Sequence, residues 1–371
     1  MSKKVLIDCR FIGSDSALGR YAQQLFLNLK DLASSFSFRP ILNENLKDKI
    51  PLKLIESEPV WTDIPHYSFS EQLNLPQILK KEKPDLIHFT HFNFPLFSPK
   101  PFLVTVHDLT ISKFKDKTHK FFKTLAYSVL LKQVVKKSNH IIVDSKTTKK
   151  DLIKTLKVPE GKVSVIYLGI EKKFRPQPEE KNKKVIKKYN LNSPFLLYSG
   201  QWRPHKNLIR LIQAFSILKK EYHIDEKLVL VGKEDPRYPE IKELVGKLGL
   251  EQEVLFLGFI DEDNLPAIYS LANLYVIPSL AEGFGFPPLE AMACGTPVAS
   301  SLASCMPEVL DDSVVFFDPY DVRDMASKIY LALTNNKLRQ VLVQRGFKWV
   351  KRYDWRKTAE KTLMIYENVL Q

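Results

Sequence analysis

The chain has 371 residues, 44% of them hydrophobic and 26% charged, and this is typical of a soluble globular protein with two domains. No stretch approaches the roughly 18 apolar residues of a membrane-spanning helix, and we expect no signal peptide because Asp8 and Arg10 interrupt the first apolar run. Cys9, Cys294 and Cys305 are too few and too scattered for a disulfide framework or a zinc site, so the expected compartment is a reducing cytoplasm.

The net charge of +14 is unevenly distributed along the chain. Residues 1–175 hold 30 Lys and Arg against 17 Asp and Glu, whereas the remainder is close to neutral. This asymmetry predicts that the two halves meet different partners. The basic half could face nucleic acid, an anionic membrane or an acidic substrate.

Short apolar runs alternate with amphipathic stretches from end to end. In the first half they predict strands at 5–11, 85–90, 102–108, 140–145 and 163–169, and helices at 18–32, 70–81, 118–137 and 147–157. In the second half they predict strands at 194–200, 227–232, 253–260, 274–279, 297–301 and 314–319. Strands that are apolar throughout and separated by helices indicate parallel sheets covered on both faces.

The predicted fold class is therefore α/β, with two doubly wound, Rossmann-like domains. A charged segment with Pro176 and Pro178 separates the two sets of strands, so we place the domains at 1–175 and 193–352 and a linker at 176–192. Ligands of such folds bind at the carboxyl ends of strands, and here we also expect them in a cleft between the domains.

Several common motifs are missing. There is no G-x-x-x-x-G-K-[ST], so a P-loop is excluded, and no G-x-G-x-x-G, so a nicotinamide or flavin enzyme is disfavoured. Asp261-Glu262-Asp263 has the pattern of an acidic metal site. Since acidic residues are expected before a helix such as NLPAIYSLA, we interpret the triplet as a helix start, and no metal is predicted.

The stretch SGQWRPHKNLIRLIQAF, residues 199–215, predicts an anion-binding loop. A strand ends at Gly200, Arg203, His205 and Lys206 follow, and a helix begins near Asn207. Cations at a helix amino terminus oppose the helix dipole, but they become favourable if an anion binds beside the free N–H groups. The alternative is that these are solvated loop charges.

The stretch SLAEGFGFPPLEAMACGTPVASS, residues 279–301, places Glu282 and Glu290 on either side of Gly-Phe-Gly-Phe-Pro-Pro. The prolines predict a helix start, so Glu282 should lie in a loop and Glu290 in the first helical turn, with Gly295 ending the helix. Taken singly, each glutamate could be an ordinary turn or helix acid. Together with the cationic loop, two separated carboxylates match a nucleotide-sugar, whose hydroxyl groups flank a diphosphate.

This second stretch resembles the E-x7-E signature of the retaining glycosyltransferases of family 4, which have the GT-B fold. Further segments are similar to that family in the expected order, namely SALGRYAQQLFLNL, TVHDL, VDSKTTKKDL, VIYLGIEKKFRP, LYSGQWRPHKNLIRLIQAF, SCMPEVLDDSVVFFDPYD and WRKTAEKTLMIYENVL. The resemblance covers nearly the whole chain. It implies that residues 353–371 form a helix that returns to the N-terminal domain.

The resemblance also implies roles for individual residues. Glu282 would bind the hydroxyl groups of the donor sugar and Glu290 the ribose, while Arg203 and Lys206 would hold the diphosphate. The backbone of Gly283, Phe284, Gly285 and Phe286 would face the sugar and phosphates, with Ile260 beside the donor, Gly19 approaching the diphosphate, and His107 near the reacting carbon. Without the family, His107 would be interpreted as a strand-end histidine paired with Asp108. One departure is Gln201, which stands where many members have arginine, and whether Arg203 replaces that arginine is left open.

The predicted activity is a retaining, metal-independent hexosyltransferase without a cofactor. Glu282 is expected to position the donor and not to act as a nucleophile. Similarity to mannosyltransferase-type members indicates GDP-mannose as the donor and a glycan or lipid-linked acceptor in surface polysaccharide synthesis. The alternatives are a nucleotide-sugar epimerase or hydrolase of the same architecture and, from the net charge, a nucleic-acid-binding protein.

The basic stretch 113–137 holds eight lysines and apolar residues at helical spacing. It could lie on an anionic membrane at the cytoplasmic face of the inner membrane, near a lipid-linked acceptor. It could equally pack its apolar side on the sheet with the lysines in water.

Overall fold

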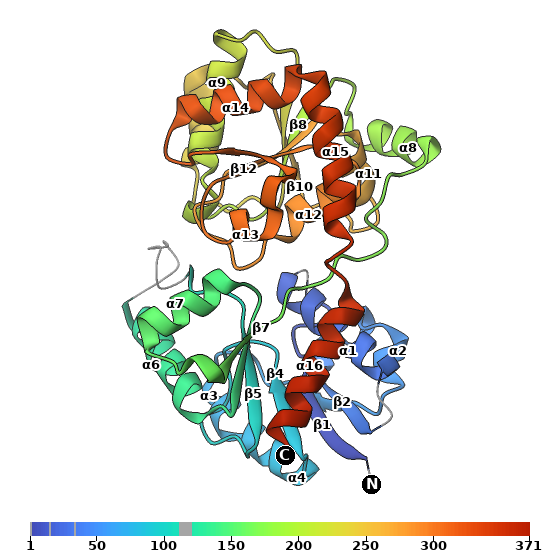
Figure 1. Ribbon diagram of the computed structural model, residues 1–371, viewed down its shortest axis with the longest axis vertical. Coiled ribbons are helices and arrows are strands. Elements are labelled where there is room, and N and C mark those ends of the chain that lie inside the picture. The colour runs from blue at the N-terminus through green and yellow to red at the C-terminus, as the bar shows by residue number, and fades with distance from the viewer. Residues whose placement is uncertain (1, 15, 33–34, 111–120) are drawn as a thin grey trace. The chain divides into compact units, whose positions relative to one another are not determined.

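The computed structural model describes residues 2–14, 16–32, 35–110 and 121–371. These residues form two compact units (Figure 1). Unit 1 holds the described residues up to 110, residues 121–169 and the C-terminal segment Tyr353–Gln371, and unit 2 holds Ile170–Arg352. Each unit is built on one parallel sheet, so the predicted α/β class with two doubly wound sheets is confirmed.

Unit 1 contains a seven-stranded sheet in the order β3-β2-β1-β4-β5-β6-β7. Its strands are β1 (Lys3–Asp8), β2 (Phe36–Asn43), β3 (Val60–Thr62), β4 (Leu86–Phe89), β5 (Phe102–Val106), β6 (His140–Val143) and β7 (Val163–Val165). Its helices are α1 (Ala17–Leu32), α2 (Leu52–Ile55), α3 (Phe69–Leu73), α4 (Leu75–Glu82), α6 (Phe121–Lys137), α7 (Lys146–Leu156) and α16 (Trp355–Val369), with short 3₁₀ turns at Glu44–Lys49 and Glu160–Lys162.

Alternate residues of the unit 1 strands face two different layers of helices. On one face, Ile87, Phe89 and Val104 join a core to which α4, α6 and α7 contribute apolar side chains. On the other face, His88 and Thr105 point toward α1 and α16, which pack against each other. Both faces are covered, which explains why these strands are apolar almost throughout.

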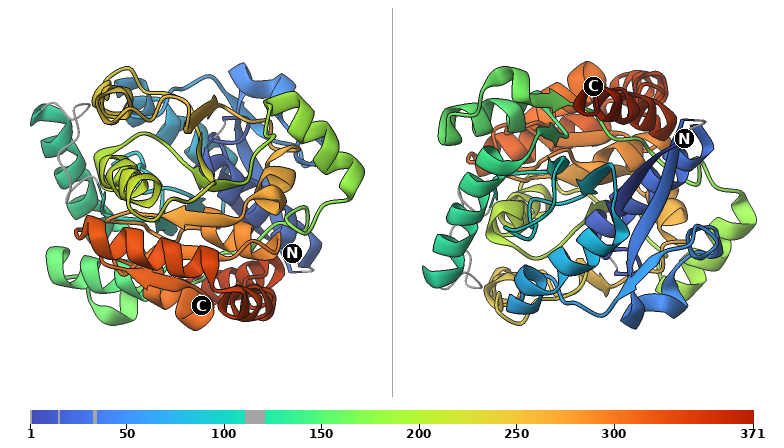
Figure 2. Two further views of the ribbon diagram at one scale, coloured as in Figure 1. Left: turned by 90° about the horizontal axis from the view of Figure 1, so that it is seen from above. Right: turned by 90° about the horizontal axis from the view of Figure 1, so that it is seen from below.

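The C-terminal helix α16 is anchored to unit 1 along its length. Near its start, the Thr358 hydroxyl donates to the Tyr167 carbonyl at 2.8 Å, and near its end the Tyr366 hydroxyl lies 2.6 Å from His88 Nδ1. Lys3 Nζ donates to the Leu370 carbonyl at 3.2 Å, so the two ends of the chain lie together (Figure 2). The last helix of the chain therefore completes the fold of its first part.

Unit 2 contains a six-stranded sheet in the order β10-β9-β8-β11-β12-β13. Its strands are β8 (Phe195–Ser199), β9 (Lys227–Val231), β10 (Val254–Gly258), β11 (Leu274–Ile277), β12 (Val298–Ser301) and β13 (Val315–Phe317). Its helices are α8 (Glu179–Tyr189), α9 (Leu208–Lys220), α10 (Glu240–Leu248), α11 (Leu265–Leu271), α12 (Phe286–Ala293), α13 (Met306–Leu310), α14 (Val322–Thr334) and α15 (Asn336–Val350), with 3₁₀ turns at Pro204–Lys206 and Asp311–Ser313.

Helices cover both faces of the unit 2 sheet. Helix α9 packs against α10 and α14, and their apolar side chains share one core with the strands. Helix α12 packs against β11, β12, α11 and α15. In both sheets the order of strands reverses next to the first strand of the unit, between β1 and β4 and between β8 and β11. Such reversal points are where parallel α/β sheets bind ligands.

The structure differs from the sequence prediction in three regions of the chain. Strands β2 and β3 were not predicted; β2 carries Pro40 at its centre, and proline is rare inside a parallel strand. The helix expected at 70–81 is divided at Asn74 into α3 and α4, because Pro76 lacks the N–H that would continue the first helix. The segment expected as a linker at 176–192 contains α8, which packs on α11, and the units divide at Ile170.

Candidate active site

The loops that follow β8 and β11 meet at the reversal point of unit 2. Asn207, which is buried and has the left-handed conformation, donates from its side chain to the carbonyls of Pro278 and Pro319 at 3.0 and 2.8 Å. The Leu280 N–H donates to the His205 carbonyl at 2.7 Å. The cationic loop and the glutamate loop are therefore joined, and α9 begins at Leu208, close to the predicted start.

The local sequence explains why Glu282 and Glu290 lie on different elements. Helix α12 begins at Phe286 after Gly285, whose φ of +88° lies in the left-handed region. A side chain at position 285 would be strained by that φ, and its Cβ would lie 2.6 Å from the Met306 methyl carbon, which would have to move. Gly295, with φ of +85°, follows the end of the helix as predicted. Glu282 lies in the loop as expected, but Glu290 is the fifth residue of α12 and so lies in its second turn, not the first.

Lys206 and Glu282 form a nearly buried ion pair. Lys206 Nζ donates to the two carboxylate oxygens of Glu282 at 2.7 and 2.9 Å. The backbone of Glu282 is held as well, because its N–H donates to Ser304 Oγ at 3.2 Å and its carbonyl accepts from the same hydroxyl at 2.9 Å. Burial alone would raise the pKa of Glu282, but the Lys206 ammonium outweighs it and holds that pKa below its usual value.

Glu290 is buried and belongs to a chain of hydroxyl groups. Its carboxylate accepts from the Tyr269 hydroxyl at 3.0 Å, and that hydroxyl lies 2.9 Å from Ser199 Oγ at the end of β8. Glu282 and Glu290 are thus both placed beside the same strand ends. The ribose contact expected of Glu290 stays a prediction.

The other residues expected at the donor site also belong to unit 2. Phe284 and Phe286 pack edge to face with their ring centroids 5.5 Å apart, and Gly283 is buried beside them. Ile260 is buried just after β10. Arg203 precedes the 3₁₀ turn that carries Lys206, and its charge contributes to lowering the pKa of Asp235, which follows β9.

Unit 1 positions His107 at the end of β5, but with a different partner from the one considered in the sequence. His107 Nδ1 lies 2.6 Å from Asp144 Oδ2, at the end of β6, and Nε2 lies 2.9 Å from the Thr90 carbonyl. The pair with Asp108 is therefore replaced by a pair with Asp144. Burial lowers the pKa of His107, but Asp144 outweighs it and raises the pKa above its ordinary value. The Thr90 carbonyl can only accept, so Nε2 carries a proton and donates to it.

The fold of unit 1 itself requires glycine at position 19. A Cβ at this position would lie 2.4 Å from the Phe11 carbonyl oxygen, so the loop after β1 closes directly over the start of α1. The Gly19 N–H donates to Ser16 Oγ at 3.1 Å. The approach of a diphosphate to Gly19 remains a prediction.

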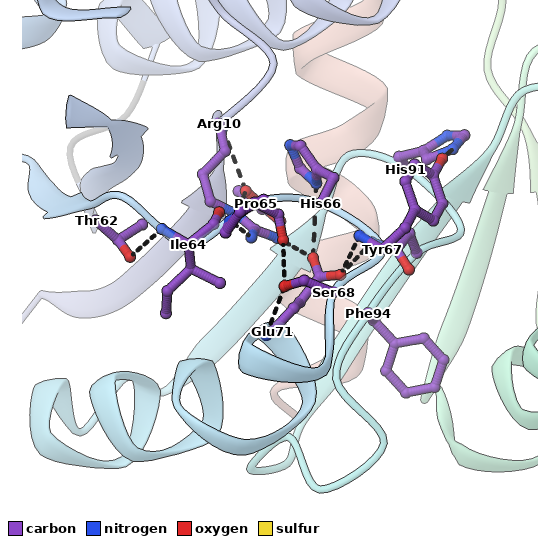
Figure 3. Close-up of polar contacts among 12 residues, drawn as sticks. Arg10, Thr62, Ile64, Pro65, His66, Tyr67, Ser68, Glu71, His91 and Phe94 are labelled. Atoms are coloured by element: carbon purple, nitrogen blue, oxygen red, sulfur yellow. Dashed lines mark hydrogen bonds and ion pairs between the residues drawn. The ribbon is translucent and has the colours of Figure 1, made fainter. Parts of the chain in front are cut away.

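A second group of polar and aromatic side chains, which no sequence motif indicates, lies at the reversal point of unit 1. Arg10 follows β1 and bridges two buried carboxylates, with Asp8 Oδ2 and Glu71 Oε1 each 2.7 Å from Nη2. Figure 3 shows the Glu71 carboxylate beneath His66 and Tyr67, with Tyr67 beside His91. Asp8 ends β1 and Glu71 lies in α3, and the others come from the loops after β1, β3 and β4, so only their positions near the ends of apolar runs could have indicated them.

Two residues of the acidic triplet Asp261-Glu262-Asp263 form ion pairs with lysines. Lys188 Nζ lies 2.9 Å from Asp261, and Lys173 Nζ lies 2.7 Å from Glu262. Within the described ranges, no three His, Cys, Asp or Glu side chains are grouped so that they could hold a metal ion. None of the helices in the described part of the chain is long and apolar enough to cross a membrane.

Comparison with known proteins identifies the family. Residues 41–174 match the model of Glycosyltransferase Family 4, and residues 179–349 match the model of Glycosyl transferases group 1. The O-antigen chain mannosyltransferase RfbU of Salmonella typhimurium strain LT2 is 30% identical over 289 residues, which are 78% of this chain and 75% of RfbU. The chain belongs to the family 4 glycosyltransferases. The family resemblance found in the sequence is confirmed.

Two further comparisons show how much of a relative's length this glycosyltransferase covers and which fold it shares. It is 29% identical to the O-antigen chain mannosyltransferase B of Escherichia coli over 61% of its own length, but it spans only 60% of that relative. The crystal structure of Anabaena Alr3699/HepE in complex with UDP-glucose has a TM-score of 0.78 and 18% identity, covering 98% of this chain and 99% of that one. The structural likeness shows the fold, and the predicted GT-B fold is confirmed.

Proposed function

We propose that this glycosyltransferase moves mannose from GDP-mannose to a glycan or lipid-linked acceptor in surface polysaccharide synthesis, with retention of anomeric configuration and without a metal ion. The observation that carries the proposal is the Lys206–Glu282 pair, held at the reversal point of unit 2 beside the glycine-rich start of α12. RfbU and mannosyltransferase B, which are related to this chain, are both described as O-antigen mannosyltransferases. That relationship favours mannose, and family membership favours transfer over epimerisation, hydrolysis or nucleic-acid binding.

The chemistry of the donor explains why a cation is needed there. When the bond between sugar and diphosphate breaks, negative charge develops on the leaving diphosphate and positive charge on the sugar ring. Lys206 has three N–H donors, of which the bonds to Glu282 use two, so a third can reach a phosphate oxygen. A fixed cation at that position stabilises the leaving group in the transition state.

Glu282 supports retention without a protein nucleophile. Its carboxylate is ionised and shared with Lys206, which makes it a good acceptor for the sugar's hydroxyl groups and a poor nucleophile. In the proposed reaction Glu282 orients the sugar, and the acceptor hydroxyl attacks from the side that the diphosphate leaves.

Part of the basic segment 113–137 lies outside the described residues. In its described part, Tyr127, Leu131 and Val134 of α6 are buried in the unit 1 core, while Val129 and Lys132 are exposed. We propose the membrane contact only for this exposed side, whose lysines would meet anionic lipid headgroups.

The test is transfer from a panel of nucleotide-sugars to a mannose-terminated glycan, with and without EDTA. We expect product with GDP-mannose, the α configuration of the donor kept in the product by NMR, and a rate that EDTA does not change. Donor incubated alone is the control, since an epimerase would convert it without acceptor. An inverted product, loss of activity with EDTA, or transfer only from another donor would contradict the corresponding part of the proposal.

A further inference from the structure

Four aromatic rings gather at the reversal point of the unit 1 sheet. They are Phe11 after β1, His66 and Tyr67 after β3, and His91 after β4, and we call them the ring cluster. Phe11 and His66 stack with ring centroids 3.7 Å apart and planes 8° apart, and Phe11 meets His91 edge to face at 5.5 Å. The Tyr67 hydroxyl lies 2.7 Å from His91 Nε2.

Polar atoms around these rings lack partners. Among the described residues, His66 Nε2, His91 Nδ1 and the Tyr127 hydroxyl are buried and have no hydrogen-bond partner. Tyr127 is only 7% exposed, and Phe92, the neighbour of His91, packs edge to face against it at 4.9 Å. Since buried polar atoms are nearly always satisfied, these three atoms require partners from outside the chain.

The chemistry of the unpaired atoms selects the ligand. Burial and the nearby His107 charge hold the pKa of His91 well below its usual value, so the ring is neutral. Depending on which nitrogen carries the proton, Nδ1 of His91 is either a donor or an acceptor. A hydroxyl group fits both cases because it can donate and accept, and so it also matches the Tyr127 hydroxyl.

The charges beneath the ring cluster disfavour an anion. The Arg10 guanidinium is already bound by Asp8 and Glu71, and Glu71 also accepts from the Asn93 side chain at 2.6 Å and the Tyr67 N–H at 2.8 Å. This buried network fixes the loop that carries His66 and Tyr67 (Figure 3). Its one guanidinium is already shared by two carboxylates, so this network has no unpaired charge with which to bind a phosphate.

We propose that the ring cluster is a binding subsite for a neutral pyranose of the acceptor glycan. Tyr67, whose side chain is 59% exposed, offers an open ring face to the C–H groups of the sugar, while His91 Nδ1, His66 Nε2 and the Tyr127 hydroxyl bind its hydroxyl groups. The assignment to the acceptor rests on the proposed function. The assignment to a neutral sugar rests only on the ring cluster.

The first test compares matched variants in the transfer assay. Tyr67→Phe removes one hydroxyl at a largely exposed position, so the fold is kept, and Tyr320→Phe makes the same change at a 61% exposed tyrosine of unit 2. We expect Tyr67→Phe to raise the KM for the acceptor about tenfold, because His91 loses the hydroxyl that holds its ring in place and with it the hydrogen bond from Nδ1 to the sugar. The KM for the donor and kcat should stay unchanged, and Tyr320→Phe should match the wild type in all three. An unchanged acceptor KM in Tyr67→Phe would overturn the inference while the proposed function stands.

The second test needs no turnover. Methyl α-mannopyranoside is titrated into the full chain with its histidines isotope-labelled, and the ring signals are assigned with His66→Gln and His91→Gln. We expect the signals of His66 and His91 to shift with the glycoside and not with inorganic phosphate at the same concentration. Signals that ignore the glycoside, or that respond to phosphate alone, would overturn the inference. If the enzyme transfers no sugar at all, the proposed function fails, and this titration still decides the subsite.

Discussion

At the scale of single residues, the Lys206–Glu282 pair joins stability to function. Glu282 is only 13% exposed, so removing Lys206 would leave a largely buried carboxylate without the cation that neutralises it. Because a donor sugar and its diphosphate would bind these same two groups, the pair keeps both charges stable while the site is unoccupied. A substitution at either residue should therefore affect both the free energy of unfolding and the transfer activity.

Replacing Lys206 by methionine should lower the free energy of unfolding by roughly 3 kcal/mol, because it leaves a buried charge unpaired. The double variant Lys206→Met/Glu282→Gln should recover most of that loss but no activity. Urea denaturation and the transfer assay measure the two effects. Lys188→Met is the control, since it breaks a pair of similar length, Lys188–Asp261, whose side chains are mostly exposed. If Lys206→Met is as stable as the wild type, the described pair is not formed in solution.

The contribution of the Lys206–Glu282 pair to folding stability also depends on pH. The pKa of Glu282 is lowered in the folded chain, so the pair stabilises the fold above the ordinary value of 4.5. That contribution is lost as the pH falls through the folded pKa. The stability difference between the wild type and the double variant should therefore be constant near neutral pH and shrink only in acid.

His107 shows how far residues could be predicted from the sequence. Its place at the end of a strand follows from the apolar run before it, but its partner, Asp144, is 37 residues away at the end of another strand. The pairing depends on β5 and β6 being neighbours in the sheet, and no local sequence pattern predicts that. The ring cluster was missed for the same reason, because its members come from three loops that meet only in the folded sheet.

At the scale of elements, helix α16 is tied to the unit 1 sheet by a buried chain of hydrogen bonds. The Tyr366 hydroxyl lies 2.6 Å from His88 Nδ1, His88 Nε2 lies 2.8 Å from Thr105 Oγ1, and that hydroxyl lies 2.9 Å from the Tyr21 hydroxyl of α1. The chain thus links β4, β5, α1 and α16. The Tyr21 ring in turn packs edge to face on His107 with centroids 4.7 Å apart.

This chain predicts an acid-sensitive fold. Burial lowers the pKa of His88 to about 3, so between pH 6.5 and 3 the unfolded chain takes up a proton that the folded chain does not. His88→Gln removes this titration but weakens the bonds to Tyr366 and Thr105. We expect the variant to be less stable at pH 8, and its deficit to shrink by about 1.4 kcal/mol per pH unit below pH 6.5. Urea unfolding followed in unit 1 measures this, and a deficit independent of pH would show that His88 takes up its proton as readily in the folded state as in the unfolded chain.

Elements whose apolar pattern is strong were predicted well, and the others were not. The strands at the centre of each sheet are buried on both faces and stand out as apolar runs. Strand β3 is three residues long, and β2 carries Pro40, so packing against β1 and not local preference makes them strands. Helix α8 is highly charged, and a single fully buried side chain, Val185, attaches it to its neighbours.

At the scale of the whole molecule, the two units divide the proposed reaction between them. Lys206, Glu282 and Glu290 all belong to unit 2, and His107 and the ring cluster belong to unit 1. The described residues of unit 2 also form one continuous segment with its own core, whereas unit 1 needs α16 from the far end of the chain. Donor binding and acceptor binding should therefore be separable by cutting the chain.

Residues 170–352 expressed alone should fold and bind GDP within about threefold of the full chain, a difference of less than about 1 kcal/mol, but should transfer no sugar. Residues 1–169 alone should fold poorly, because without α16 the Tyr21, His88 and Thr105 side of the sheet meets water. Calorimetric titration with GDP and circular dichroism measure these outcomes, and Lys206→Met in the 170–352 fragment is the control that should weaken binding. If the fragment folds but does not bind GDP, residues of unit 1 are part of the nucleotide site. If residues 1–169 fold as stably as the intact unit, α16 serves another purpose than completing that core.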